Sequence, residues 1–283
     1  MAICTDDSLK NATSISTIMS VPNVTEMPTI DFPNLAWHLT FEDNFETLDR
    51  TRWSLLDECS TQNGCVHNAE EQVYLSSQVR VEAGSLVLEA TNESHTSVVS
   101  GTRQYRSGKV DSAHFFAQQY GRFEARIKLP VGRGMLMPHG GRCWPTDGEI
   151  DIMEYVGQFP NHIHGNYHFG PSCNHNLHDD QNVCGVTGKP KKVVLNDAYH
   201  IYAVEWTPTS LVWFFDGQLY YKLDSSQCKN KKLFFIPNKP FYIIFNLAVG
   251  GSWPGSPTAA TIFPQRMYVD YVRVYKQGIS HDV

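Results

Sequence analysis

Three carboxylic acids within six residues, Glu149, Asp151 and Glu154, are the part of this sequence best suited to chemistry. The residues between them are Ile and Met, which favour a strand, and in a strand Glu149 and Asp151 share a face. Glu154 is then out of phase by one residue, unless a bulge at Ile152 and Met153 inserts the missing position. Crowded like charges raise one another's pKa. An ionised carboxylate beside a protonated carboxyl group can supply the nucleophile and the acid of a retaining glycosidase.

Two simpler interpretations compete with a catalytic one. An acidic residue in an apolar run is usually the solvated face of an amphipathic element. A helix would also bring positions 150, 153 and 154 together. The Ile content of the segment and the turn-forming residues 144–148 before it favour a strand.

Short apolar runs separated by turn residues predict the elements that must position these acids. Asp216 and Gly217 separate two of the runs and indicate a hairpin, and helical periodicity over more than ten residues is absent. The pattern predicts an all-β, two-sheet antiparallel sandwich. The predicted strands are 78–81, 85–90, 115–129, 149–156, 163–169, 200–206, 211–215, 219–223, 241–248 and 267–275.

Composition excludes several classes of function. The chain has 283 residues, 41% of them hydrophobic, which is enough for a sizeable core. Its net charge of −6 and the lack of a long basic run disfavour a nucleic-acid partner. No apolar run is long enough to span a membrane. We expect a monomer, in which most aromatic residues pack in the core and a minority form stacking platforms for sugars.

Cysteines and sequons favour a secreted protein. Seven cysteines match no zinc-site spacing, and Cys59/Cys65 and Cys173/Cys184 each bracket a polar loop that a local disulfide would close. The odd cysteine count argues the other way. Acceptor sequons for N-glycosylation begin at positions 11, 23 and 92. Residues 1–33 lack periodicity and read as a disordered leader of a mature or truncated secreted form, followed by a domain at 34–277 and a tail at 278–283.

Four motifs in order resemble glycoside hydrolase family 16, and the likeness runs from about residue 37 to 276. Residues 148–157, GEIDIMEYVG, resemble the family signature in its bulged form, with Met between the second and third acids. The other similar segments are YGRFEARIKLP at 120–130, NLAVGGSWPG at 246–255 and VDYVRVY at 269–275. The resemblance implies a concanavalin A-like β-jelly roll that holds its substrate in a concave cleft.

The resemblance also implies roles for single residues. Glu149 resembles the nucleophile and Glu154 the acid/base, with Asp151 between them to tune the pair. Calcium, where the family binds it, is implied at Asn44, Gly84 and Asp270, and no cofactor is implied for catalysis. The residues that match substrate contacts are Asn68, Trp144, His168, Asn246 and Trp253. Trp206, in a matching segment, is expected to be a core residue.

One segment departs from the family pattern. The family normally has a Trp- and Pro-containing strand beside the catalytic one. Here residues 132–134 run directly into 135–138, so that about six residues are missing and ladder bonds of a central strand would be lost. Either another segment compensates, or the chain is less stable and less active than its relatives.

The sequence therefore supports an endo-acting retaining hydrolase of β-1,3-glucan (laminarin-type) or mixed β-1,3/1,4-glucan. The alternative is a β-glucan-binding recognition protein with weak or no catalysis, because of the shortened strand. A plain adhesion sandwich carrying a chance motif is a third class. The bulged signature argues against the lichenase and xyloglucan branches, and transglycosylation remains open because it differs only in what attacks the glycosyl-enzyme.

Overall fold

Two antiparallel β-sheets make up most of the secondary structure of this computed structural model, which describes residues 1–5, 35–132, 135–136, 144–173, 175–177, 194–227 and 235–279. Helical structure within these ranges is confined to two single turns of 3-10 helix, Ser76–Gln78 and Ser225–Gln227. None of the described residues forms a helix both long and apolar enough to cross a membrane. The predicted all-β sandwich is confirmed.

The six-stranded sheet contains the acidic segment. In order across the sheet, its strands are β14 (His164–His168), β13 (Glu149–Glu154), β1 (Ala2–Thr5), β18 (Phe241–Asn246), β10 (Lys109–Asp111) and β3 (Ser54–Leu55).

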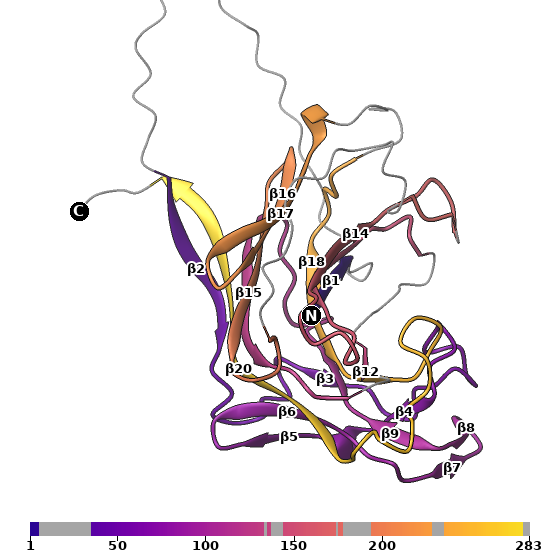
Figure 1. Ribbon diagram of the computed structural model, residues 1–283. Helices are drawn as coiled ribbons and strands as arrows, with labels where there is room; N and C mark the ends of the chain where they lie inside the picture. Colours follow the sequence, from indigo (N-terminus) through magenta and orange to yellow (C-terminus); the bar gives the residue numbers. More distant parts are fainter. Residues whose placement is uncertain are drawn as a thin grey trace, which may run out of the picture.

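The eight-stranded sheet covers the other side of the core. In order, its strands are β17 (Gln218–Asp224), β16 (Ser210–Phe215), β15 (His200–Trp206), β11 (Gly121–Lys128), β20 (Gln265–Ile279), β6 (Ser85–Ala90) and β5 (Val79–Glu82), and β2 (Leu35–Asp43) also pairs with β20. Figure 1 shows β15, β16 and β17 of this sheet facing β1, β14 and β18 of the other.

Three two-stranded ribbons lie outside the main sheets. They are β12 (Met135–Leu136) with β19 (Ala248–Val249), β4 (Gln72–Tyr74) with β9 (Tyr105–Ser107), and β7 (His95–Ser97) with β8 (Gly101–Arg103). The β4–β9 pair is parallel, whereas the other two are antiparallel.

Large aromatic side chains fill the space between the two sheets. Trp206 on β15 is 1% exposed and packs against Phe241 on β18, with ring centroids 5.0 Å apart. Trp213 on β16 is fully buried, and its Nε1–H donates a hydrogen bond to the main-chain oxygen of Asp151 at 2.8 Å. Burial of these rings stabilises the sandwich. The hydrogen bond from Trp213 to Asp151 holds the acidic strand against the facing sheet. Trp206 is a core residue, as expected.

The N-terminal residues correct the predicted leader. Residues 2–5 form β1, which pairs with β13 on one side and with β18 on the other, so they belong to the sheet that carries the acids. Residues 6–34 lie outside the described part of the chain. At the other end, β20 continues to Ile279, where Gly278 and Ile279 pair with β2, so the predicted boundary at 277 is two residues early. The expectation failed at residues 1–5 because a segment this short has no periodicity of its own.

A disulfide and a carboxylate fix the loop that follows β3. Cys59 and Cys65 are bonded, with Cα atoms 5.2 Å apart, which confirms the first predicted pair. Cys173 is also disulfide-bonded, and its predicted partner Cys184 lies outside the described residues.

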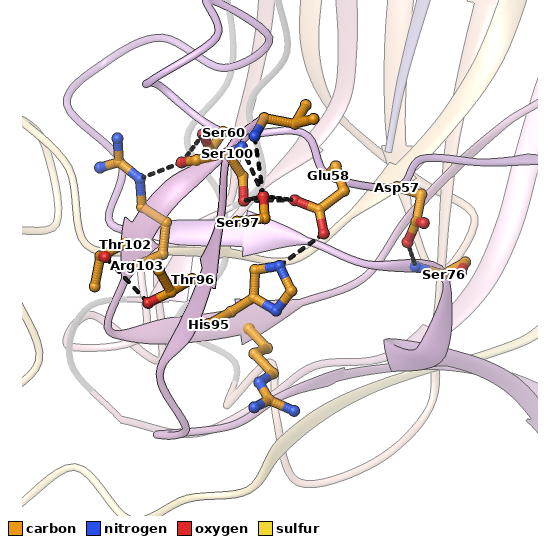
Figure 2. Close-up of polar contacts among 12 residues, drawn as sticks. Asp57, Glu58, Ser60, Ser76, His95, Thr96, Ser97, Ser100, Thr102 and Arg103 are labelled. Carbon is orange, nitrogen blue, oxygen red and sulfur yellow. Dashed lines mark hydrogen bonds and ion pairs between the residues drawn. The ribbon is translucent and has the colours of Figure 1, made fainter.

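The carboxylate beside this disulfide is that of Glu58. It accepts hydrogen bonds from Ser97 Oγ (2.5 Å), Ser100 Oγ (2.6 Å) and His95 Nε2 (2.7 Å), as Figure 2 shows. The bonds from Ser100 and Ser97 hold the pKa of Glu58 below its ordinary value. These bonds attach Glu58, next to the disulfide, to the β7–β8 hairpin.

Candidate active site

Strand β13 carries the three acids, and its pairing with β14 places them on one face. The β14 partners occupy alternate positions 164, 166 and 168, so they project to the same side of the sheet. Residues directly opposite each other in an antiparallel pair also share a face. The pairs, with the β13 residue first, are Glu149 with His168, Asp151 with Asn166 and Glu154 with His164.

A bulge produces this shared face. The register between β13 and β14 shifts between Asp151 and Glu154. On the other edge of β13, the main-chain N–H groups of Ile152 and Met153 both donate to the carbonyl oxygen of Met1, at 3.0 and 3.3 Å. Two residues opposing one partner residue is the pattern of a β-bulge. The bulge predicted from the sequence is therefore confirmed, and it returns Glu154 to the side of the other two acids.

Glu149 is 2% exposed and accepts a hydrogen bond from Trp144. The indole Nε1–H of Trp144 donates to Glu149 Oε2 at 2.6 Å, and its ring lies against the His168 imidazole with centroids 5.2 Å apart. Burial, together with the charge of Asp151, raises the pKa of Glu149 well above its ordinary value. The His168 charge and the Trp144 bond oppose that rise, because both stabilise the carboxylate.

The buried Asp151 pairs with the partly exposed His168 beside the two glutamates. Asp151 is 1% exposed, and its Oδ2 lies 3.0 Å from His168 Nε2, while the amide of Asn176 lies 2.9 Å from His168 Nδ1. Burial alone lowers the pKa of His168, but contact with Asp151 and the charges of both glutamates raise it to about 10. His168 is therefore an imidazolium at neutral pH and offsets part of the negative charge.

Glu154 is 3% exposed and accepts a hydrogen bond from Asn166 Nδ2. Burial, followed by the charge of Asp151, raises its pKa to about 8, against the opposing influence of His168, of the Asn166 bond and of the Met1 amino group. Glu154 is therefore protonated at neutral pH. A protonated carboxyl group on the same sheet face as Glu149 can act as a general acid.

Two of the predicted substrate contacts come from neighbouring loops. Trp253 is 45% exposed, and its ring lies edge-on to His164, the partner of Glu154, with centroids 5.0 Å apart. Asn68 is exposed, and its carbonyl oxygen accepts the main-chain N–H of Ser252 at 2.7 Å. The structure thus joins the Asn68 and Trp253 loops, and their contact with substrate stays a prediction.

Asn246 belongs to a buried polar network that sequence reasoning missed. It is 1% exposed, donates to the hydroxyl of Tyr74 at 3.1 Å and stands opposite Lys109 on β10. Gln72 donates to Glu70 at 2.7 Å, and burial raises the pKa of Glu70 to about 7. The hydrogen bond to Tyr74 fixes the orientation of the Asn246 side chain.

Two further residues at the acids were also missed. Asn166 precedes His168 by two positions, so the alternation of a strand could have found it. Asn176 follows β14 in an irregular segment, and nothing in the local sequence indicates that it reaches His168.

The backbone brings the three predicted calcium ligands to one part of β20. Asn44 follows the β2 residue that pairs with Val272, and Gly84 lies in the β5–β6 turn, two residues before the partner of Val269. Asp270 lies between these two positions, but its Oδ2 already accepts a bond from Arg126 Nη1 at 2.6 Å. The backbone placement suits a hard cation, whereas the carboxylate is paired with a guanidinium.

The sequence profile of the glycosyl hydrolases of family 16 matches residues 67–273, which is most of the chain and includes all three acids. The chain belongs to glycosyl hydrolase family 16. Among curated relatives, the chain is 35% identical over 270 residues to glucan endo-1,3-beta-glucosidase A1 of Niallia circulans, and 35% identical over 225 residues to a beta-glucanase of Rhodothermus marinus. These alignments cover 88% and 74% of the chain, but 39% and 75% of the relatives, so the chain spans well under half of the first one.

Solved structures of similar proteins have the same fold. The chain superimposes on an endo-beta-1,3-glucanase from Pyrococcus furiosus with a TM-score of 0.76 and 32% identity, covering 88% of this chain and 100% of the other. For the laminarinase catalytic domain from Thermotoga maritima, the TM-score is 0.73 and the identity 34%, with 85% and 98% covered. Membership of family 16 and the sandwich fold are thus shown by both sequence and structure.

Proposed function

We propose that this family 16 protein is an endo-acting, retaining glycoside hydrolase that cleaves β-1,3-glucan of the laminarin type, or mixed β-1,3/1,4-glucan. The observation that carries the proposal is the bulge at Ile152 and Met153, since it puts Glu154 on the same sheet face as Glu149. The names of the relatives support the substrate class, because the first two are an endo-1,3-beta-glucosidase and a beta-glucanase.

In the first step, Glu149 is the nucleophile and Glu154 the acid. A Glu149 carboxylate oxygen attacks the anomeric carbon, while the Glu154 carboxyl proton moves to the departing glycosidic oxygen. The sugar–oxygen bond breaks, and an ester forms between the sugar and Glu149. The pKa of about 8 keeps Glu154 protonated for this step. Glu149 reacts as the carboxylate, which Trp144 and His168 stabilise against the opposing effects of burial and of the Asp151 charge.

In the second step, Glu154 is the base. It takes a proton from water as the water oxygen attacks the anomeric carbon, and the bond to Glu149 breaks to release the sugar with its original configuration. The Asp151–His168 pair, with its atoms 3.0 Å apart, lies beside both glutamates and influences their charge. The same enzyme would transglycosylate if a sugar hydroxyl replaced the water.

The alternative of a non-catalytic glucan-binding protein depended on the shortened strand beside the catalytic one. In the structure, β12 (Met135–Leu136) pairs with β19, and β1 pairs along β13. The acidic strand therefore keeps a neighbour on each edge, which removes the physical reason for expecting an inactive site.

Release of reducing ends from laminarin tests the proposal. The native protein is expected to release them, and Glu149→Gln to release almost none, because the amide cannot form the glycosyl ester. Glu46→Gln, at an exposed position, is the matched control and should retain activity. Binding of laminarin by folded native protein without any new reducing ends would establish the binding protein instead.

We further propose that the protein works outside the cell, as a monomer, on a polysaccharide substrate. The Cys59–Cys65 disulfide supports an oxidising compartment. Asn92, in an acceptor sequon, is exposed and so open to glycosylation. Detection of a glycan on Asn92 by mass spectrometry of protein from the native source would support export, whereas reduced cysteines in that protein would contradict it.

A structural calcium ion near Asp270 is also a proposal. The carbonyl groups of Asn44 and Gly84 with the Asp270 carboxylate supply suitable oxygen atoms, provided that Asp270 leaves Arg126. Calcium should then raise the melting temperature relative to chelator, and should raise it more in Arg126→Gln. Identical melting curves with and without calcium in both proteins would contradict the proposal.

A further inference from the structure

We infer that the N-terminal segment Met1–Thr5 is part of the catalytic apparatus, in which the main chain of Met1 positions the acid/base Glu154 through the bulge in β13. The inference rests on the proposed function of Glu154. It assigns a positioning role to residues that lie outside the 67–273 region matched by the family profile.

The register of β1 makes it an interior strand of the six-stranded sheet. Ala2 pairs with Asp151 on β13 and with Ile244 on β18, so the strand lies between them as an interior member of the sheet. Figure 1 shows indigo β1 beside gold β18. An interior strand bonds on both edges. Without β1, β13 and β18 would each have an unpaired edge in the middle of the sheet.

Met1 contacts the bulge in β13 through its main chain. The carbonyl oxygen of Met1 accepts hydrogen bonds from both Ile152 and Met153, and the Met1 nitrogen donates to the Met153 oxygen at 3.2 Å. In a bulge, two residues of one strand oppose a single residue of the partner strand. Met1 is the residue opposite the bulge, so it fixes the one position where β13 departs from regular alternation.

Met1 is itself anchored in the core. Its side chain is 1% exposed and belongs to the core cluster between the sheets, which also contains the fully buried Ile152 and Met153. The same residue is therefore held by its side chain in the core and by its main chain at the bulge. Such double anchoring can hold a neighbouring catalytic group in place.

The consequence is largest for Glu154, although Asp151 and Glu149 also lie opposite β1, at Ala2 and Cys4. Glu149 and Asp151 precede the bulge and share a face by ordinary alternation. Glu154 follows the bulge, and without the extra residue it would point to the opposite face of the sheet. Loosening β1 should therefore impair the acid/base more than the nucleophile.

Ile3→Pro is the disruptive variant and Ile3→Val its conservative counterpart. Proline removes a main-chain N–H from a strand that has neighbours on both edges, whereas valine keeps the N–H and the β-branched side chain. For Ile3→Pro, kcat/KM on laminarin should fall by about 100-fold, since a misplaced catalytic group costs that much. Ile3→Val should stay within a few-fold of the native protein.

A substrate with an activated leaving group distinguishes positioning of Glu154 from general damage. The dinitrophenolate group of a dinitrophenyl β-laminaribioside leaves without protonation. The kcat/KM for this substrate should therefore be largely retained in Ile3→Pro, as in Glu154→Gln. Added azide should raise kcat in both variants, because the anion attacks the glycosyl-enzyme without a base. Equal losses on both substrates, or no azide effect, would overturn the inference, as would laminarin activity close to that of the native protein.

Hydrogen exchange in the native protein decides the matter if Ile3→Pro does not fold. The amide protons of Ile152 and Met153 should exchange as slowly as those of the interior strand β18. Exchange at the rate of exposed amides would show that Met1 does not hold the bulge. If the native protein cleaved neither substrate, the proposed function would fail, whereas the exchange measurement would still report on β1.

Discussion

Replacing Glu154 with glutamine should remove activity on laminarin and at the same time make the protein more stable than the native protein at alkaline pH. Glutamine has nearly the shape of a protonated glutamic acid, and its oxygen can still accept the bond from Asn166. It cannot ionise, however. The fold holds Glu154 with a pKa of about 8, compared with the ordinary 4.5, so the folded state resists loss of this proton.

The sign and size follow from proton binding. Between pH 4.5 and 8, folded Glu154 is protonated while the unfolded residue is ionised, so the folded state binds more protons and stability falls as pH rises. The full contribution is present below pH 4.5 and is lost above pH 8. At about 1.4 kcal/mol per pKa unit, the loss across this window is on the order of 3–5 kcal/mol.

Denaturant unfolding at pH 5, 7 and 9 measures this effect. The free energy of unfolding of Glu154→Gln minus that of the native protein should increase from pH 5 to pH 9 by a few kcal/mol. The titration of His168 does not cancel completely in the difference, because the charge of Glu154 contributes to its raised pKa. Glu46→Gln, at an exposed position, is the matched control for the loss of one carboxyl group. A pH-independent difference for Glu154→Gln, or one of opposite sign, would refute the reasoning.

Three further predictions concern the surroundings of the acids. Trp144→Phe removes the Nε1–H that donates to Glu149, so the acidic limb of the kcat/KM profile should move to higher pH, and an unmoved limb would contradict this. Trp253→Ala, at a side chain 45% exposed, should raise KM on laminarin with little change in melting temperature; a large drop in melting temperature would show a core role instead. Replacing Cys59 and Cys65 by serine opens a loop with a sequence separation of 6, which should cost about 2 kcal/mol in urea unfolding, and no loss would mean that the loop is ordered without the bond.

Local sequence was sufficient where local rules decide the structure. Alternation with one inserted residue placed Glu149, Asp151 and Glu154 on one face, because the bulge changes only the phase of a single strand. Asp216 and Gly217 gave the β16–β17 hairpin, where both residues have positive φ, 47° and 73°. The predicted strand at 115–129 was too long, since β11 begins only at Gly121.

Pairing between strands that are far apart in the sequence could not be predicted from the sequence. Met1 contacts residues about 150 positions away, and no pattern within five residues indicates which sheet they would join. The shortened segment before β13 showed that a neighbour was missing, but not which segment replaces it. The network of Glu70, Gln72 and Tyr74 around Asn246 was missed for the same reason, because two separate strands, β4 and β18, bring it together.

Covalent trapping of the glycosyl-enzyme tests the central claim most directly. A 2-deoxy-2-fluoro β-laminaribiosyl donor with a good leaving group slows the second step, so the ester should accumulate and can be located by peptide mass spectrometry. We predict one sugar per protein, attached to Glu149, with none attached in Glu149→Gln. A sugar on any other residue, or an active enzyme that releases product with inverted configuration and no trapped ester, would contradict the assignment of Glu149 and Glu154.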